Sequence, residues 1–200
     1  MGIARPFLID MPPEWSGPRV ILRRYREEDA PLLFDAVLES QSHIRQWLPW
    51  ADAYRTIDDA VEFVRRQSGH WASSEQVGMA IFSRADGAYL GGSGFTIRSL
   101  AVPSFEIGYW LRQSAEGHGY MTEAVRLITT YLFESLGAQR VCIRCDARNV
   151  RSKTVAERLG YSFEGCTRND EIGTDGTLRD TLTYALIPDA FARVRTAWRS

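Results

Sequence analysis

The chain has 200 residues, of which 44% are hydrophobic and 24% charged, as in globular proteins that bury a full core. Its 24 lysines and arginines nearly balance 25 aspartates and glutamates, and the net charge of −1 provides no positive field for nucleic acid or an anionic membrane. The opening residues lack the pattern of a secretory signal, and no apolar run reaches the roughly 18 to 20 residues of a membrane-spanning helix. We expect a cytoplasmic protein with no membrane or nucleic-acid partner.

The first half of the chain predicts a strand, two helices and a hairpin. Residues 19–24 (RVILRR) are typical of a strand, and Asp29 is positioned to cap a helix whose apolar residues recur at helical spacing. A loop rich in aromatic residues follows, and a second helix is expected over residues 56–71. The Asp86-Gly87 pair between two β-rich runs then indicates a hairpin.

The second half alternates strands with helices. Strands are predicted over residues 105–111, 140–146, 161–165 and 178–187, and helices over 119–136, 152–160 and 188–200. Without a repeat or a long linker, this order predicts one mixed α/β sheet flanked by helices. We assign residues 1–18 to an N-terminal extension, 19–187 to a single domain and 188–200 to a C-terminal helical tail.

Cys142 and Cys145 have the spacing of a redox or metal-binding pair. They fall in RVCIRC, which is typical of a strand, and no second pair accompanies them. Odd spacing along a strand sends the two side chains to opposite faces. We therefore expect reduced, chemically inert cysteines and no metal site.

The segment EGHGYMT, residues 116–122, joins a strand to a helix through a Gly-x-Gly turn. Gly117 and Gly119 let the backbone approach a ligand closely, and the free N–H groups of the next helical turn can hold a pyrophosphate. The alternative is that the turn only connects the two elements. Thr122 stands where a dinucleotide fingerprint needs glycine, and the chain contains no P-loop, so NAD and mononucleotides are disfavoured.

Three segments in this order, FEIGYWL, EGHGYMTEAV and RVCIRCDARNVRSKTVAERLGYSFEG, closely resemble the coenzyme A-binding core of the GNAT superfamily, in its RimJ/RimL-type branch. The likeness spans roughly residues 19–187, because LRRYREEDA, WLPW and GTLRDTLTYAL also fit it. It implies the GNAT fold, a mixed and mostly antiparallel sheet in which two central parallel strands, residues 105–111 and 140–146, splay apart. The pantetheine arm of acetyl-CoA would lie between them like an additional strand.

The resemblance also implies that acetyl-CoA is bound mainly by backbone groups. Trp110, Leu111 and Arg112 would pair with the pantetheine, and Asn149 would lie against it. The pyrophosphate would be held by Gly117, His118, Gly119, Tyr120, Met121 and Thr122. Glu116 departs from the family pattern by placing a negative charge beside that pyrophosphate, and we expect Arg112 and His118 to offset it.

Two residues are the catalytic candidates that the resemblance implies. Glu106 opens the strand that passes the thioester and would accept the proton of the amine, directly or through water. Ser152 would protonate the departing thiolate, in a chain that has Ala156 where many family members carry a tyrosine acid. The residues themselves leave other interpretations open. Glu106 could be a solvent-facing strand residue, and Asn149 or Ser152 could simply cap the short helix.

Trp47 and Trp50 are the candidates for binding the acceptor. The resemblance puts WLPW beside the acceptor site, where rigid aromatic side chains can line a peptide-sized pocket. The alternative is that both tryptophans belong to the core.

The predicted function is direct transfer of an acetyl group from acetyl-CoA to a primary amine, with a protein N-terminal α-amine as the first choice and no metal. A small amine (an antibiotic, polyamine or amino acid) and a non-catalytic acyl-CoA-binding sensor are the alternatives, because the cofactor motifs do not define the acceptor. Similar proteins are often dimers, so a homodimer is one oligomeric state to test.

Overall fold

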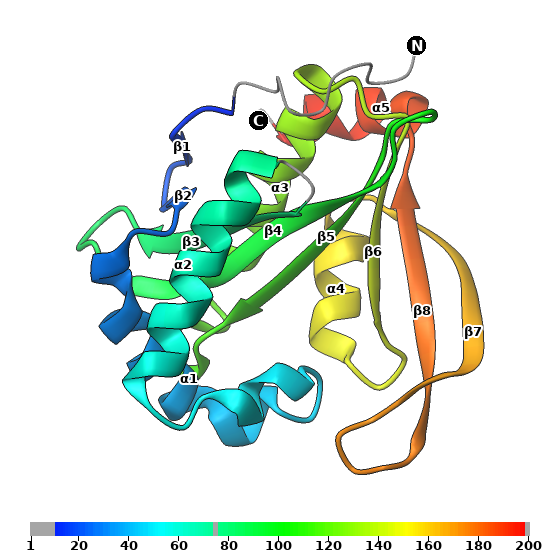
Figure 1. Cartoon of the computed structure of the whole chain (residues 1–200). Coiled ribbons are helices and arrows are strands. Elements are labelled where there is room, and N and C mark those ends of the chain that lie inside the picture. Colours follow the sequence, from blue (N-terminus) through cyan, green and yellow to red (C-terminus); the bar gives the residue numbers. More distant parts are fainter. Residues whose placement is uncertain (1–10, 74–75, 199–200) are drawn as a thin grey trace.

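One sheet runs through the described part of the chain, residues 11–73 and 76–198 of the computed structural model (Figure 1). Its strands are β1 (Glu14–Ser16), β2 (Val20–Arg24), β3 (Gln76–Ser83), β4 (Tyr89–Ser99), β5 (Ser104–Leu111), β6 (Arg140–Asp146), β7 (Ser162–Ile172) and β8 (Leu178–Leu186). Their order is β1-β2-β3-β4-β5-β6-β8-β7, and the neighbouring pairs are antiparallel except β5 and β6, which are parallel. The mixed sheet predicted from the sequence is therefore confirmed.

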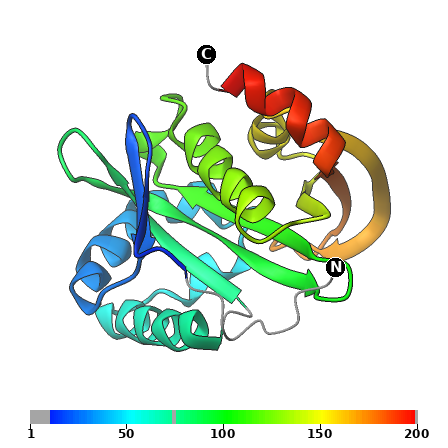
Figure 2. The ribbon, with the colours of Figure 1, turned by 90° about the horizontal axis from the view of Figure 1, so that it is seen from above.

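Helices cover both faces of this sheet. They are α1 (Ala30–Ile44), α2 (Ile57–Ser73), α3 (Tyr120–Glu134), α4 (Val150–Arg158) and α5 (Pro188–Trp198). Figure 2 shows α1 and α2 on one face and α3 on the other. Leu33 of α1 packs in one core with Phe82, and Ile128 of α3 packs in a second core with Met79. Each amphipathic helix thus buries its apolar side against the sheet.

β5 and β6 pair over only a short stretch. Their register runs from Ser104↔Arg140 to Glu106↔Cys142 and stops there, although β5 continues to Leu111. Beyond this point β5 stays paired with β4 and β6 with β8, so the two strands separate and divide the sheet into two halves (Figure 1). The expected splay of the two parallel strands is confirmed. Backbone groups along such an opening can pair with an extended ligand.

The first hairpin turns at the predicted residues, and one strand is longer than predicted. The β3–β4 hairpin turns at Asp86-Gly87, and β7 and β8 are joined through the turn at Asp175-Gly176. β7 continues to Ile172, beyond the predicted end at residue 165, because it stays paired with β8 in a partly irregular register. Within the described residues, no helix is long and apolar enough to cross a membrane.

Two local features differ from the prediction. β1 lies within the segment assigned to the N-terminal extension, where it pairs with β2 and buries Trp15. Asp29 stands at the N-cap position of α1, but its side chain makes no capping bond. Its carboxylate instead accepts two hydrogen bonds of 2.7 Å from Arg23 and one of 2.8 Å from the Arg26 N–H. An ion pair with Arg23 therefore takes the place of the expected cap.

Candidate active site

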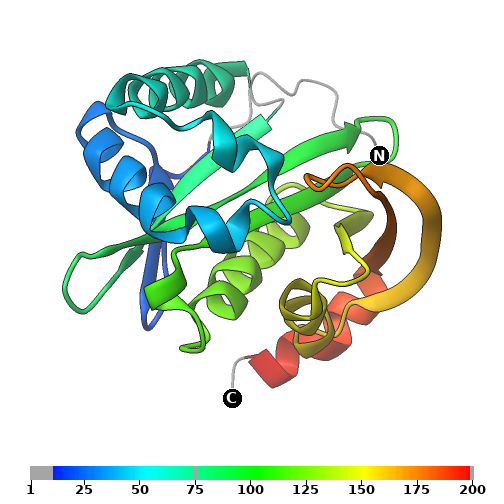
Figure 3. The ribbon, with the colours of Figure 1, turned by 90° about the horizontal axis from the view of Figure 1, so that it is seen from below.

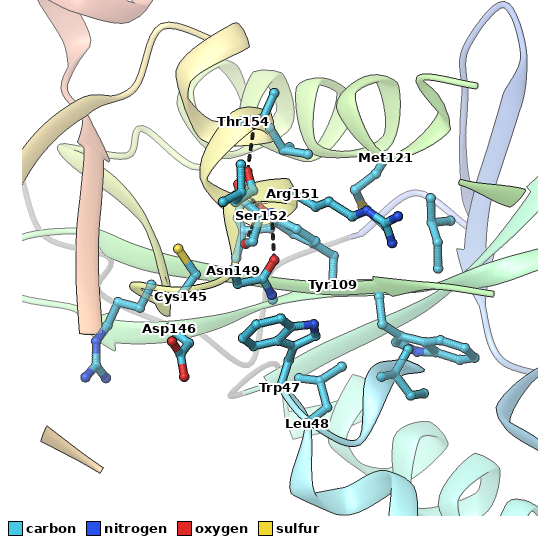
Figure 4. Close-up of a pocket in the computed structure, with 18 of the residues that line it drawn as sticks. Trp47, Leu48, Tyr109, Met121, Cys145, Asp146, Asn149, Arg151, Ser152 and Thr154 are labelled. Carbon is cyan, nitrogen blue, oxygen red and sulfur yellow. Dashed lines mark hydrogen bonds between the residues drawn. The ribbon is translucent and has the colours of Figure 1, made fainter. Parts of the chain in front are cut away.

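The opening between β5 and β6 holds a cavity of about 720 Å³ (Figure 4). It extends from the turn before α3, along α4, to the loop after α1. The residues proposed from the sequence that line it are Trp47, Glu106, Trp110, Leu111, Gly117, Gly119, Met121, Thr122, Asn149 and Ser152. The structure therefore brings most of the predicted site together.

The turn before α3 forms one end of the cavity. Gly117 and Gly119 have φ angles of 81° and 76°, in the left-handed region that side chains with a Cβ rarely adopt. A Cβ on Gly119 would also lie 3.2 Å from the Arg19 guanidinium. Since α3 begins at Tyr120, the N–H groups of its first turn have no helical acceptor and carry the positive end of the helix dipole. This end of the cavity can therefore hold an anionic group.

A buried carboxylate fixes that turn to the sheet. Glu123, only 2% exposed, accepts hydrogen bonds from the N–H groups of Arg19 (2.8 Å) and Val20 (3.1 Å) and from Arg19 Nε (2.8 Å). Arg19 Nη1 in turn donates to the His118 carbonyl at 2.7 Å. Burial raises the pKa of Glu123, but the hydrogen bonds from Arg19 and Val20 outweigh burial and leave the pKa lowered. The ionised carboxylate therefore holds the turn against β2.

Glu116 is paired with groups that the sequence did not indicate. Its Oε1 lies 2.8 Å from His43 Nε2 at the end of α1, and its Oε2 accepts a hydrogen bond from Arg151 of α4. All three residues line the cavity. His43 and Arg151 are 73 and 35 residues away from Glu116 along the chain, so no local sequence motif predicts these contacts.

Arg112 does not line the cavity, contrary to expectation. Its guanidinium pairs with Glu39, its N–H donates to the Leu90 carbonyl at 2.9 Å, and its carbonyl accepts from the Ala115 N–H at 3.0 Å. Both backbone groups have partners within the protein, but the carbonyl can accept a second hydrogen bond, so the pantetheine contact at Arg112 stays a prediction. The expectation that Arg112 offsets Glu116 is wrong, because the guanidinium is paired with Glu39 instead.

His118 and Tyr120 also lie outside the cavity wall. Their rings stack with centroids 5.6 Å apart, and the Arg19 guanidinium lies 6.0 Å from the centroid of the Tyr120 ring. The ring of His118 is thus directed to Tyr120 rather than to Glu116. A contact of these two residues with a pyrophosphate stays a prediction.

Asn149 caps α4, which is one of the interpretations that the sequence left open. Its Oδ1 accepts a hydrogen bond of 3.0 Å from the Ser152 N–H. Ser152 is therefore the third residue of the helix and not its cap. Because both residues line the cavity, capping by Asn149 also fixes the position of the Ser152 hydroxyl.

The Ser152 hydroxyl contacts a tyrosine that the sequence analysis did not single out. Tyr109 OH lies 3.0 Å from Ser152 Oγ and 3.1 Å from the Ser152 carbonyl oxygen. Burial raises the pKa of Tyr109, and the hydrogen bond with Ser152 lowers it by less, so the phenol stays protonated. Figure 4 shows Tyr109 reaching from β5 toward Ser152 on α4. The sequence shows only an apolar strand at FEIGYWL, which carries no signal of this contact.

Glu106 lines the cavity at the point where β5 and β6 stop pairing. Arg98 of β4 donates to its Oε2 from Nε at 2.9 Å and from Nη2 at 2.5 Å. With 22% of its side chain exposed, Glu106 is neither fully solvent-facing nor buried. Its carboxylate therefore borders the cavity while it is paired with an arginine.

Two further carboxylates, Asp146 and Glu171, line the same cavity and were not proposed from the sequence. Burial raises the pKa of Asp146, but the hydrogen bonds from Arg148 outweigh burial and leave the pKa lowered. Glu171 forms an ion pair with Arg179 of β8. All three carboxylates are paired with arginines, but Asp146 is buried, whereas Glu106 and Glu171 are partly exposed and are the candidates for accepting a proton.

Trp47 and Trp50, predicted to line one acceptor site, face different cavities. Trp47 lies opposite Asn149 and Tyr109 in the main cavity (Figure 4). Trp50 lines a neighbouring cavity of about 560 Å³ between α2 and strands β3 to β5, where its ring centroid lies 5.6 Å from that of Trp110. The two cavities share the walls formed by Leu48, Gly108, Tyr109 and Trp110.

The loop that carries Trp47 spans the opening of the sheet. Arg179 Nη1 of β8 donates to the Trp47 carbonyl at 3.4 Å, so this loop contacts the half of the sheet that lies beyond β6. Figure 3 shows the loop after α1 running toward the β7–β8 turn. The main cavity is therefore bounded by both halves of the sheet.

Cys142 and Cys145 are free thiols in different environments. Burial raises the pKa of Cys142 to about 11, so it stays protonated. Cys145 lines the cavity, and burial raises its pKa as well, more than a hydrogen bond with Ser152 lowers it. Over residues 11–73 and 76–198, no group of three His, Cys, Asp or Glu side chains is arranged to hold a metal ion.

Comparison with known proteins identifies the family. The model of the acetyltransferase (GNAT) domain matches residues 19–162. The chain belongs to the GNAT acetyltransferase family. It is 31% identical to the probable N-acetyltransferase YjcK of Bacillus subtilis (strain 168), over 87% of this chain and 97% of that protein. It is 25% identical to the ribosomal-protein-serine acetyltransferase of Escherichia coli (strain K12), over 84% of this chain and 93% of that protein.

A solved structure of RimL, named as a ribosomal L7/L12 alpha-N-protein acetyltransferase in complex with coenzyme A, has the same fold. It superimposes with a TM-score of 0.80 at 26% identity and covers 87% of this chain and 97% of RimL. These relatives put the GNAT enzyme in the RimJ/RimL-type branch. It is an N-acetyltransferase of GNAT type, an acyltransferase that depends on acetyl-CoA.

Proposed function

We propose that this GNAT enzyme acetylates the N-terminal α-amine of a protein or peptide, by direct transfer from acetyl-CoA. The observation that carries the proposal is the continuity of one cavity from the glycine turn, past Ser152, to Trp47 and β8. A cosubstrate held at the turn would leave the far end, beside Trp47, for an extended acceptor. The names of the ribosomal-protein-serine acetyltransferase and of RimL support a protein N-terminus as that acceptor.

The residues along the cavity fit acetyl-CoA. The turn of Gly117 and Gly119 and the first turn of α3 would hold the pyrophosphate through backbone N–H groups. The backbone of Trp110 and Leu111 would pair with the pantetheine where β5 has lost β6 as a partner. Cys145 on the same wall supports this assignment, because the coenzyme A in the RimL structure is joined to a cysteine by a disulfide.

The proposed reaction exchanges one bond at sulfur for one at nitrogen. The C–S bond of the thioester and an N–H bond of the amine break, and a C–N amide bond and an S–H bond form. Glu106 or Glu171 would accept the proton from nitrogen, directly or through water, and Ser152 would donate a proton to the departing sulfur. The proton released by the amine then replaces, through solvent, the one that Ser152 gave.

The chemistry of the amine favours an α-amine over a lysine side chain. An amine attacks only when it is neutral, and an α-amino group with a pKa near 8 is roughly 10% neutral at about pH 7. A lysine with a pKa near 10.4 is below about 0.1% neutral at that pH. An N-terminal substrate therefore demands less of a carboxylate base.

The experiment that tests the proposal is a screen of acceptors. Isotopically labelled acetyl-CoA is incubated with N-terminally free peptides, the same peptides with blocked N-termini, and a set of small amines, and the products are identified by mass spectrometry. We expect the label on the α-amine of free peptides only. Labelling of small amines alone would show that the enzyme is a small-molecule acetyltransferase instead. No release of coenzyme A thiol with any acceptor would favour a non-catalytic sensor.

A further inference from the structure

The phenol of Tyr109 is within hydrogen-bond distance of two oxygens of the same residue. It lies 3.0 Å from Ser152 Oγ and 3.1 Å from the Ser152 carbonyl oxygen. Regular structure holds both partners in position. Tyr109 is paired with Ser93 inside the β4–β5 ladder, and Ser152 stands in the first turn of α4, whose cap is Asn149. The short distances are therefore a property of the fold rather than of one mobile side chain.

Beside the hydrogen bond between Ser152 and Cys145, the two hydroxyl groups can share their protons with each other in two ways. In the first arrangement, Tyr109 donates to the Ser152 carbonyl and Ser152 donates to the Tyr109 oxygen, so both protons are used within the pair. In the second, Tyr109 donates to Ser152 Oγ, and the Ser152 proton is free to point into the cavity. Only the second arrangement lets Ser152 donate to a sulfur in that cavity.

We propose that Tyr109 is a positioning residue that sets the direction of the Ser152 hydroxyl, with the first arrangement in the resting enzyme and the second when the thiolate forms. The inference rests on the proposed role of Ser152. Negative charge that develops on the sulfur attracts the Ser152 proton, and the Tyr109 O–H then turns from the carbonyl oxygen to Oγ. Donation from Tyr109 strengthens the bond from Ser152 to sulfur, because hydrogen bonds in a chain polarise one another.

No proton is lost by Tyr109 in this step. Burial raises the pKa of its phenol, so a buried tyrosinate would be costly, and only the direction of its O–H bond changes. Since the second arrangement is stabilised only as the thiolate develops, the contribution of Tyr109 belongs to the transition state. It should therefore appear in kcat and not in the KM for acetyl-CoA.

The test is a double-mutant cycle of Tyr109→Phe, Ser152→Ala and the double variant. Rates of thiol release are measured with acetyl-CoA and whichever acceptor of the screen is acetylated fastest, peptide or small amine. We expect Tyr109→Phe to lower kcat by about 10-fold and to leave the KM for acetyl-CoA within about 2-fold. Ser152→Ala should lower kcat by about 10- to 100-fold. In the Ser152→Ala background, Tyr109→Phe should cost nothing further.

A matched control separates this role from a loss of packing. Tyr161→Phe removes another buried phenol oxygen, whose partner is Thr129 Oγ1 at 2.6 Å and which does not line the cavity. We expect it to keep the kcat of the native enzyme. Ser152→Thr retains a hydroxyl at the same position, and in that background Tyr109→Phe should again lower kcat by about 10-fold.

Two results for Tyr109→Phe would overturn the inference while leaving Ser152 as the proposed acid. The first is a native kcat for Tyr109→Phe. The second is a loss that persists at full size in the Ser152→Ala background, which would show that Tyr109 acts by packing alone. A native kcat for Ser152→Ala is a different outcome, because it removes the proposed acid itself and the inference with it. Thermal unfolding of each variant shows that rates are compared at equal folded fraction.

Discussion

His43 Nε2 lies 2.8 Å from Glu116 Oε1, and Arg151 bonds the other oxygen of the same carboxylate. The end of α1, the residue before the glycine turn and the first turn of α4 are thereby joined across one end of the cavity. The carboxylate pairs with the Arg151 guanidinium and lies against His43, next to the place proposed for the pyrophosphate. Glu116 and a bound pyrophosphate therefore compete for the same positive charge.

We predict that Glu116→Gln binds acetyl-CoA about 3- to 10-fold more tightly at low salt, because the change removes a negative charge and releases Arg151. The gain should shrink as salt is added. Isothermal titration calorimetry at two salt concentrations measures both effects. Glu164→Gln is the control, since its partner Arg140 lies outside the cavity. Weaker binding by Glu116→Gln would mean that the bridge is needed to shape the turn.

We predict that Gly119→Ala and Gly137→Ala each lower the melting temperature by a few degrees, because a Cβ at their positive φ angles of 76° and 63° is strained. Only Gly119→Ala should also lose thermal protection by acetyl-CoA, since Gly137 lies at the other end of α3. NAD and ATP should protect the native enzyme much less. Equal protection of both variants by acetyl-CoA would contradict the assignment of the pyrophosphate to this turn.

We predict that replacing the catalytic base impairs turnover more at low pH than at high pH, because a proton acceptor matters most while the amine is charged. Glu106→Gln and Glu171→Gln are compared by kcat/KM between about pH 6 and pH 9, where an α-amine deprotonates. The resemblance assigns the pH-dependent loss to Glu106. If Glu171→Gln shows it instead, the base is Glu171. A native profile for both would leave water as the acceptor.

We predict that Glu123 stabilises the folded protein at neutral pH and that this contribution is lost in acid. Its folded-state pKa is lowered, so this stability is present above the unfolded pKa of about 4.3 and is lost as the pH falls through the folded value. Glu123→Gln should cost about 1 to 3 kcal/mol at neutral pH, since it weakens hydrogen bonds to a buried charge. As the pH falls from about 4.3 through the folded-state pKa, the native protein should converge with the variant.

Urea unfolding at a series of pH values measures this difference in the free energy of unfolding. Glu134→Gln, a more exposed glutamate at the far end of the same helix, is the control and should leave the pH dependence unchanged. Parallel pH curves for the native protein and Glu123→Gln would rule out the proposed contribution.

The sequence predicted what depends on local pattern. Alternating apolar residues marked the strands, and the glycines at 117 and 119 marked the turn that the structure gives left-handed φ angles. It did not predict contacts between side chains from distant segments, such as Tyr109 with Ser152 or His43 with Glu116. Arg112 shows why. Its position in the sequence suggests that it acts near the turn, but its guanidinium pairs with Glu39, which the packing of α1 brings close.

The β5–β6 register joins the two halves of the sheet through three residue pairs, and beyond them the strands part. In its hydrogen bonding the sheet is thus two halves with a narrow backbone connection and a ligand-sized gap beside it, while one apolar core, with Met79 in one half and Ile143 in the other, spans both. An extended ligand in that gap would continue the interrupted ladder of hydrogen bonds between the halves. We therefore expect substitutions in β7 or β8, far from the proposed pyrophosphate site, to change acetyl-CoA affinity by altering the width of the gap.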